Sequence, residues 1–248
     1  MSLVAFYSEG QKVFGNLHLA SKKSPCVICL HGLEGSKESV KWRTFASRFS
    51  SEGYACLRFN FRGCGKGPEK SEGSFRDSNL TSRIGDYLAA LAFLRSLSTR
   101  IDIRRLGVIG SSFGGMVALA AGDPRVEAMI TLATPYTFPS FAKSGNSIES
   151  EGYVLPSGRR LGRGFLEDIK KYDILKTVRD PKRAPLLIIH GGSDEIVSVE
   201  QAYRLAEEAS LPKRFEIIEA ADHVFSGAHL HKVMNLCLAW FRKYLLRS

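Results

Sequence analysis

The stretch of sequence that decides the fold runs from an apolar strand through a tight turn into a helix. It reads Leu106-Gly107-Val108-Ile109-Gly110-Ser111-Ser112-Phe113-Gly114-Gly115. Residues 110–114 match the pattern G-x-S-x-G, in which a serine occupies a sharp strand-to-helix turn. Such a turn brings backbone close to backbone, so small residues are needed two positions before and after the serine. Only Ser112 has glycine at both positions, because Ser111 has Ile109 and Phe113 there instead. The pattern predicts that Ser112 exposes its hydroxyl as a nucleophile.

Around this turn, apolar runs of strand length alternate with segments of helical periodicity. The runs are Leu3–Tyr7, Lys12–Leu19, Cys26–Leu30, Tyr54–Phe61, Leu106–Ile109, Ala128–Ala133, Leu186–Ile189 and Phe215–Ile218. Apolar residues at three- and four-residue spacing predict helices over residues 42–49, 84–94 and 230–245. This order predicts an α/β fold in a single domain over residues 1–248. Its core would be a doubly wound, mostly parallel sheet of about eight strands with helices on both faces.

One segment interrupts the alternation after the sixth predicted strand. Residues 135–184 are rich in serine, glycine and basic side chains, and they lack a sustained apolar period before Phe165–Leu175. We expect a short helix over that last stretch. Long insertions of this kind in compact domains are usually lids or binding loops. The sequence therefore predicts a lid or cap over residues 135–184.

Composition and charge exclude several classes of protein. The chain has 248 residues, 44% of them hydrophobic, and a formal net charge of +10. Its basic residues are spread along the chain rather than gathered into a recognisable module, so we expect no nucleic-acid partner. No apolar run approaches the length of a membrane span. We expect no secretory signal, because residues 1–10 do not pair a basic start with an apolar run. The five cysteines are odd in number and mostly lie in apolar runs, which favours free thiols and a cytoplasmic location.

Two further strand ends carry residues that could activate the Ser112 hydroxyl. A hydroxyl is a weak nucleophile unless a base takes its proton and a third group orients that base. Asp194 follows the run 186–189 across a glycine-rich turn, and His223 follows the run 215–218. Because ligand and catalytic sites form at the carboxyl ends of parallel strands, we expect these side chains to meet there. The sequence therefore predicts a catalytic triad of Ser112, Asp194 and His223.

Neighbouring acids and the other histidines are weaker candidates for the triad. Asp222 adjoins His223 and Glu195 adjoins Asp194, but successive side chains in an extended chain usually point apart. We expect both carboxylates to be solvated surface groups. Four histidines are expected to be structural because they do not occur in the required order with a serine and an acid: His18, His190, His229 and His231.

The end of the third strand can supply the remaining requirement, stabilisation of a developing oxyanion. Its sequence is Leu30-His31-Gly32-Leu33-Glu34-Gly35. An HG-type turn can present a backbone N–H beside that of the residue after the nucleophile. This predicts that the amides of Leu33 and Phe113 form the oxyanion hole. We expect His31 to lock the turn by hydrogen bonding, because the donors needed are backbone groups.

These residues together resemble the α/β-hydrolase superfamily over nearly the whole chain. The resemblance is carried by the His31-Gly32 turn, the strand end Phe59-Asn60-Phe61-Arg62-Gly63, the Ser112 turn, and the turns at Asp194 and His223. The loop 33–37, the turn 62–65 and the helix 86–94 are most similar to feruloyl/cinnamoyl-esterase-like and monoacylglycerol-lipase-like (serine aminopeptidase-type) members. The resemblance implies that Ser112 is the nucleophile, His223 the general base and Asp194 the acid that orients it. It also implies that no metal or cofactor is used.

The expected activity is that of a serine hydrolase that cleaves a small-molecule carboxylic ester through an acyl-enzyme. A feruloyl/cinnamoyl-type or a short-chain acyl ester fits the resemblance, while amide, peptide or thioester hydrolysis on the same triad stays open. A non-catalytic ligand-binding protein on this fold is the alternative from another class. The basic residues Arg159, Arg160 and Arg163 of the insertion are candidate substrate contacts, with a solvated basic surface as the alternative. The sequence leaves open whether the protein is a monomer or a homodimer.

Overall fold

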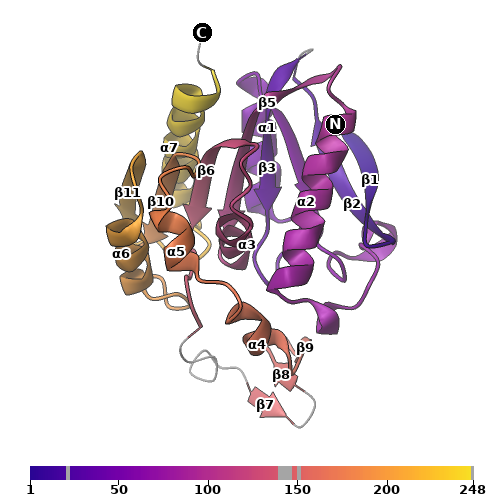
Figure 1. Ribbon diagram of the computed structural model, residues 1–248, viewed down its shortest axis with the longest axis vertical. Helices are drawn as coiled ribbons and strands as arrows, with labels where there is room; N and C mark the ends of the chain where they lie inside the picture. The colour runs from indigo at the N-terminus through magenta and orange to yellow at the C-terminus, as the bar shows by residue number, and fades with distance from the viewer. Residues whose placement is uncertain (21–22, 139–146, 150–151, 247–248) are drawn as a thin grey trace.

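The computed structural model describes residues 1–20, 23–138, 147–149 and 152–246. Its centre is an eight-stranded sheet in the order β1-β2-β4-β3-β5-β6-β10-β11 (Figure 1). The strands are β1 (Ser2–Ser8), β2 (Gln11–His18), β3 (Ser24–Leu30), β4 (Ala55–Phe59), β5 (Ile101–Ser111), β6 (Val126–Leu132), β10 (Leu186–Gly191) and β11 (Lys213–Ile218). β2 pairs antiparallel with both β1 and β4, and the other pairs are parallel. The predicted strands and the mostly parallel sheet are confirmed.

Helices cover both faces of this sheet, as the apolar periodicity predicts. They are α1 (Val40–Ser51), α2 (Leu80–Ser96), α3 (Phe113–Ala121), α6 (Val199–Glu208) and α7 (Ala228–Leu245), with 3₁₀ turns at Gly67–Glu69 and Phe75–Asp77. On one face, Phe49 of α1 and Phe241 of α7 pack together with a ring-centroid distance of 5.6 Å. On the other face, α2, α3 and α6 bury side chains such as Tyr87 and Leu205. The two cores lie on opposite sides of the sheet and fix the positions of its strand ends.

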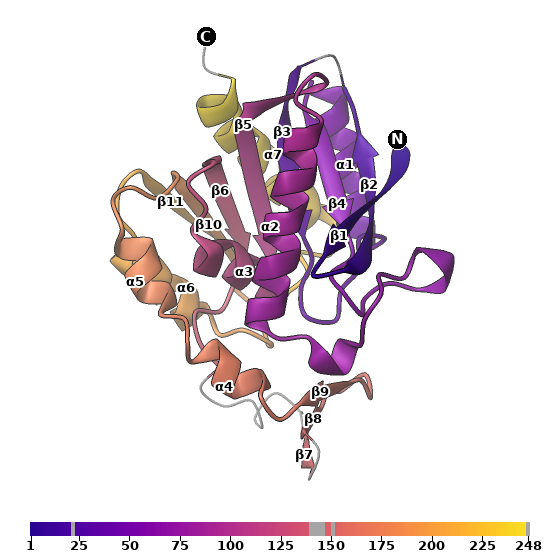
Figure 2. The ribbon, with the colours of Figure 1, turned by 45° about the vertical axis from the view of Figure 1, so that its right-hand side comes forward.

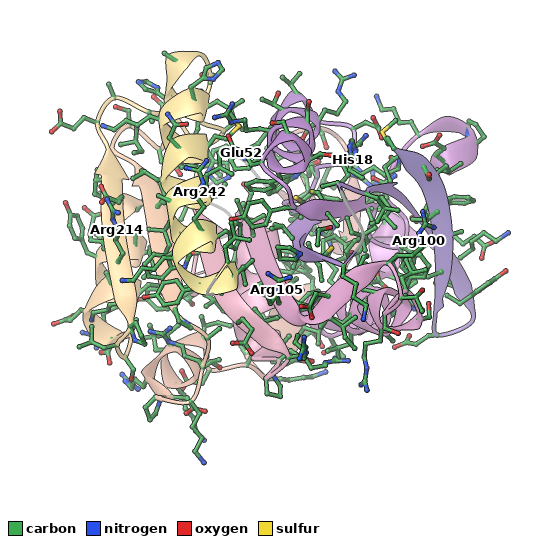
Figure 3. The ribbon with its side chains drawn as sticks, turned by 90° about the horizontal axis from the view of Figure 1, so that it is seen from above. His18, Glu52, Arg100, Arg105, Arg214 and Arg242 are labelled. Atoms are coloured by element: carbon green, nitrogen blue, oxygen red, sulfur yellow. The ribbon has the colours of Figure 1, made fainter. Side chains whose placement is uncertain are left out.

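Several basic residues lie at the end of the molecule opposite the insertion (Figure 3). There, Arg105 pairs with Asp102 at 2.9 Å, Arg214 pairs with Glu216 at 2.6 Å, and Arg242 pairs with Glu52. Surface ion pairs of this kind contribute little to stability, typically below about 1 kcal/mol each. Some of the basic side chains therefore lie in ion pairs on a solvated surface, away from the carboxyl ends of the strands.

The insertion follows β6 and lies beyond the carboxyl ends of the parallel strands (Figures 1 and 2). It contains a three-stranded antiparallel sheet, β7 (Ser147–Glu149), β8 (Gly152–Val154) and β9 (Arg160–Gly162), followed by α4 (Phe165–Ile169) and α5 (Ile174–Arg179). The prediction of one short helix over Phe165–Leu175 is wrong, because the helical stretch is broken in two. The helical stretch breaks at Asp173, whose backbone is extended. The Asp173 side chain then caps a new helix by accepting a hydrogen bond from the Lys176 amide at 2.9 Å.

The turn between β5 and α3 has the strained geometry that the glycine pattern predicts. Ser112 has φ 54° and ψ −124°, and residues other than glycine rarely adopt a positive φ. A Cβ added at Gly110 would lie 2.4 Å from the carbonyl oxygen of Gly114. A Cβ added at Gly114 would lie 2.3 Å from the carbonyl oxygen of Leu30 at the end of β3. The glycines are therefore required by close backbone contact, which leaves Ser112 at the tip of the turn.

We expect Gly110→Ala to lower the free energy of unfolding by at least about 1–3 kcal/mol, the usual cost of overpacking, because backbone must move to admit the methyl group. Gly164→Ala is the matched control, since Gly164 has φ −72° and open space where its Cβ would lie. Guanidinium denaturation of the two variants and the wild type measures the difference. Equal midpoints for the two variants would contradict the steric explanation.

Candidate active site

Ser112 opens onto a cavity of about 670 Å³ at the carboxyl edge of the sheet. His223, Leu33 and Phe113 line the same cavity, so four of the five predicted site residues border it directly. Its apolar wall includes Trp42, Phe138, Leu155, Ile196, Val197 and Val224. Cavities of this size, mostly apolar with a few polar groups, are typical of sites for small organic molecules.

The fifth predicted residue, Asp194, lies directly behind His223. Its Oδ2 is 2.8 Å from Nδ1 of His223, and its side chain is fully buried. Because an ionised carboxylate only accepts hydrogen bonds, Nδ1 is the protonated nitrogen and Nε2 is free to accept a proton. No hydrogen bond joins Ser112 to His223 in the part of the chain that the structure describes. In many enzymes this bond tightens only when substrate binds.

Asp194 is held in the ionised form by its surroundings. Burial alone would raise its pKa, but hydrogen bonds from His190 and His223 and from the backbone outweigh burial and bring the pKa well below its usual value. The Oδ1 atom accepts bonds from the amides of Ile196 and Val197, each at 2.9 Å. The turn after β10 therefore presents a fixed negative charge to the imidazole of His223.

His190 belongs to this cluster, which sequence reasoning missed. Its Nε2 is 2.8 Å from the carbonyl oxygen of Val197 and 3.2 Å from Oδ2 of Asp194. The burial of His190 against Val197 and Asp194 fits the structural role expected of it, but the sequence did not predict the contact with Asp194. Its position at the end of β10, four residues before the acid, is the signal that could have found it. Asp222, by contrast, bonds Ser226 and not His223, as expected.

The turn after β3 is locked by His31, as the sequence predicts. The amide of Phe61 donates to Nε2 at 3.1 Å, so Nδ1 carries the proton and donates to the carbonyl oxygen of Gly32 at 2.8 Å. Burial, aided by the charge of Arg83, lowers the His31 pKa to about 3, which keeps the ring neutral. A Cβ added at Gly32 would lie 3.3 Å from Cβ of Ser112, so the turn lies against the candidate nucleophile.

The two predicted oxyanion donors border this contact. Phe113 is the first residue of α3, and the first amides of a helix have no acceptor within it. Among the backbone hydrogen bonds that the described residues form in loops, turns and helix caps, none is donated by the Leu33 amide. Both amides are therefore available to a ligand atom beside Ser112.

The three basic candidates from the insertion do not line the cavity that holds Ser112. The guanidinium of Arg159 stacks on Phe75 with 3.3 Å to the ring centroid and donates to the carbonyl oxygen of Gly63 at 3.2 Å. It borders a neighbouring hollow instead. Arg160 and Arg163 are exposed residues in and just after β9. Direct contact of these side chains with a substrate beside Ser112 therefore stays a prediction without support from the cavity lining.

Lys41 is a cavity residue that no sequence signal indicated. Its Nζ donates to Oγ of Ser111 at 2.7 Å and lies 5.6 Å and 5.9 Å from the ring centroids of Trp42 and Phe225. Burial lowers its pKa to about 8, although the carboxylates of Asp222 and Asp194 partly offset that effect. A cation that loses its charge near pH 8 thus lies beside the candidate nucleophile.

The sheet order and the strained serine turn are those of the α/β hydrolases, and solved structures of that class superpose on nearly the whole chain. The chain belongs to the prolyl oligopeptidase family, whose model matches residues 39–248. No three His, Cys, Asp or Glu side chains among the described residues are grouped so that they could hold a metal ion. None of the helices in the described part of the chain is long and apolar enough to cross a membrane.

Individual relatives include proteins with esterase and hydrolase descriptions. The quorum-quenching protein AidA of Acinetobacter baumannii is 40% identical over 117 residues, 46% of this chain and 36% of that protein. The chain thus spans about a third of the length of that relative. An esterase domain from a Rhodothermus marinus protein is 27% identical over 98% of both chains, with a TM-score of 0.76. Est1E of Butyrivibrio proteoclasticus, solved with ferulic acid, shares the fold at a TM-score of 0.85 and 21% identity over 98% of this chain and 100% of Est1E.

We expect Lys41→Met to raise Tm by about 2–4 °C at pH 7, the shift that corresponds to roughly 1 kcal/mol in a chain of this size. Folding lowers the Lys41 pKa from 10.5 to about 8, so the ammonium is destabilising in the folded protein below pH 8. Between pH 8 and 10.5 the unfolded chain binds more protons, so wild-type stability gains on the variant as pH rises. Thermal melts at pH 7 and pH 10 measure this change.

The control for this experiment is Lys170→Met, at an exposed lysine paired with Glu167 at 2.7 Å. It should give no gain in Tm at pH 7. A gain for Lys41→Met that is as large at pH 10 as at pH 7 would contradict the charge explanation.

Proposed function

We propose that this protein is a serine hydrolase that cleaves a carboxylic ester through an acyl-enzyme. The observation that carries the proposal is the bond from His223 Nδ1 to the buried Asp194 carboxylate at 2.8 Å, beside a cavity that Ser112 also lines. That bond leaves Nε2 of His223 as the only basic nitrogen of the ring. A strained serine, an oriented base and two available amides are the parts that acyl transfer requires.

In the proposed reaction, Ser112 Oγ attacks the ester carbonyl while His223 Nε2 takes the hydroxyl proton. The negative oxygen of the tetrahedral intermediate accepts hydrogen bonds from the amides of Leu33 and Phe113. His223 then gives its proton to the leaving alcohol, and a water molecule repeats these steps to release the acid. Asp194 stabilises the imidazolium that forms in each half of the reaction and is not itself protonated.

The cavity favours an acyl group of small to moderate size. Its volume of about 670 Å³ and its apolar wall suit a short aliphatic or an aromatic acyl chain. Est1E, which shares this fold, was solved with ferulic acid bound. We therefore propose short-chain or cinnamoyl-type esters as the first substrates to test.

Amide or peptide hydrolysis is the second candidate, because the matching family is described by a peptidase activity. The same triad can cleave either bond, since the acyl-enzyme is common to both reactions. The two differ in how the leaving group is bound and protonated, which the cavity lining does not determine.

We place the reaction in the cytoplasm as part of this proposal. All five cysteines are free thiols buried in the two cores: Cys26, Cys29, Cys56, Cys64 and Cys237. Buried free cysteines behave as small apolar residues and suit a reducing compartment.

We expect a fluorophosphonate probe to label the wild-type protein and to leave Ser112→Ala unlabelled, because the probe reacts with an activated serine hydroxyl. Ser111→Ala is the matched control, since it removes the neighbouring hydroxyl and should keep labelling. Gel fluorescence and intact mass measure both. Equal labelling of wild type and Ser112→Ala would rule out Ser112 as the nucleophile.

We expect kcat/KM to be at least about tenfold higher for p-nitrophenyl butyrate than for p-nitrophenyl palmitate, because the bound acyl chain must fit a cavity of about 670 Å³. A prolyl p-nitroanilide tests the second candidate in the same assay. Faster turnover of the anilide than of any ester would favour a peptidase. No turnover of any substrate above that of His223→Ala would favour a ligand-binding protein instead.

A further inference from the structure

A buried arginine lies beneath the candidate oxyanion loop, outside the groups of the proposed reaction. Arg83, in the first turns of α2, is 1% exposed. Its Nη1 donates to the carbonyl oxygen of Gly32 at 3.1 Å, and its Nη2 donates to that of Leu33 at 2.6 Å. Its Nε donates to Oγ of Ser78 at 2.8 Å. Two of these bonds end on the loop that carries the Leu33 amide.

The bond from Arg83 to Gly32 is one of three that fix the direction of the Leu33 amide. The Gly32 carbonyl and the Leu33 N–H belong to one planar trans peptide unit and point in opposite directions. The Gly32 oxygen accepts from Arg83 Nη1 at 3.1 Å, from His31 Nδ1 at 2.8 Å and from the Gly35 amide at 3.2 Å. Hydrogen bonds to a carbonyl also polarise the peptide and strengthen its N–H as a donor. The Leu33 N–H therefore points away from Arg83, and Leu33 lines the cavity with Ser112.

Arg83 also contacts the residue that carries the second donor. The guanidinium carbon lies 5.2 Å from the ring centroid of Phe113 and 4.8 Å from that of Phe61. These distances are within the range of cation–π attraction, which is stronger where the cation is shielded from water. One side chain thus touches both halves of the candidate oxyanion hole.

The charge of Arg83 has no carboxylate partner within 4 Å among the residues that the structure describes. Asp86, on the same helix, accepts instead from the backbone amide of Arg62 at 2.9 Å and from its side chain. Burial lowers the Arg83 pKa from its ordinary value, but a guanidinium stays protonated in proteins. A buried charge without a carboxylate partner is costly, which points to a role for Arg83 beyond packing.

The start of α2 is fixed by a reciprocal cap just before Arg83. The side chain of Asn79 accepts from the Ser82 amide at 2.7 Å, and the side chain of Ser82 accepts from the Asn79 amide at 3.0 Å. This capping box satisfies two amides that the helix leaves without partners. It fixes the start of the helix at Leu80, three residues before Arg83.

We propose that Arg83 is a positioning residue for the oxyanion hole. It orients the Leu33 amide, holds Phe113 in place, and keeps a fixed positive charge behind the oxygen on which negative charge develops. This role rests on the proposed function, because it acts on the tetrahedral intermediate of that reaction.

The test compares Arg83→Met and Arg83→Lys with the wild type on the best p-nitrophenyl ester. We expect Arg83→Met to lower kcat by roughly 10²–10³, as loss of one oxyanion donor does. KM should change by less than about threefold, because the lost interaction is made in the transition state. Arg83→Lys keeps the charge without the paired bonds and should show an intermediate loss. If Arg83→Met does not fold, Arg83→Lys carries the test.

A second readout separates positioning from a general loss of stability. A trifluoromethyl ketone forms a tetrahedral adduct with the serine, so its inhibition constant should rise by the factor by which kcat falls. The matching methyl ketone binds without that adduct and should bind equally to all variants. Arg62→Met is the control, since Arg62 is also partly buried against α2 but bonds Asp86 rather than the loop.

Assays use variants whose melting curves show folded protein and whose active sites are counted with the fluorophosphonate probe. Wild-type kcat and inhibitor affinity in Arg83→Met would overturn the inference, as would an equal loss in Arg62→Met. A wild-type protein that hydrolyses no acyl ester would overturn the proposed function, and the role of Arg83 with it.

Discussion

The site depends on how closely the end of β3 approaches the turn between β5 and α3. The parallel pairing of Leu30 with Gly110 brings the two strand ends level. At Gly114 there is no room for a Cβ because the carbonyl oxygen of Leu30 would lie 2.3 Å away. This contact places the loop that follows β3 against Ser112, with one candidate amide on each side. A bulkier residue at the turn would push the loop away and separate the two donors.

The buried charges of the site are arranged along the proposed reaction. Asp194 lies behind His223, where positive charge would develop when the imidazole takes the serine proton. Arg83 lies behind the Gly32 and Leu33 carbonyls, on the side of the loop opposite to that where the oxyanion would form. Each fixed charge therefore opposes the sign of the charge that develops beside it. Such preorganisation stabilises a transition state without reorganising solvent, which is how electrostatic catalysis acts.

The sequence could predict the site residues that directly follow a predicted strand and lie in or after a recognisable turn. Ser112, Asp194 and His223 each follow an apolar run, so the parallel sheet brings them to one edge. His190, at the end of β10 and four residues before Asp194, could have been found in this way. Lys41 and Arg83 could not. Their roles come from tertiary contacts that span 51 residues between Arg83 and Gly32, and 70 residues between Lys41 and Ser111. Neither local propensity nor periodicity records such contacts.

The insertion was predicted because residues 135–184 lack a regular apolar period. This absence indicates where the insertion lies in the chain, but it does not indicate which residues the insertion contacts. In the structure it is anchored on the elements that carry the site. Asp168 of α4 is buried and accepts from the amide and hydroxyl of Thr81, at 2.8 and 2.7 Å, in the first turn of α2. Phe165 packs against Phe113, with ring centroids 5.5 Å apart. Because Thr81 and Phe113 belong to α2 and α3, these contacts hold α4 against the helices beside the oxyanion donors. Substitutions at cavity-lining positions of the insertion such as Leu155 would then change the cavity wall without moving those donors, which is how one fold can serve many substrates.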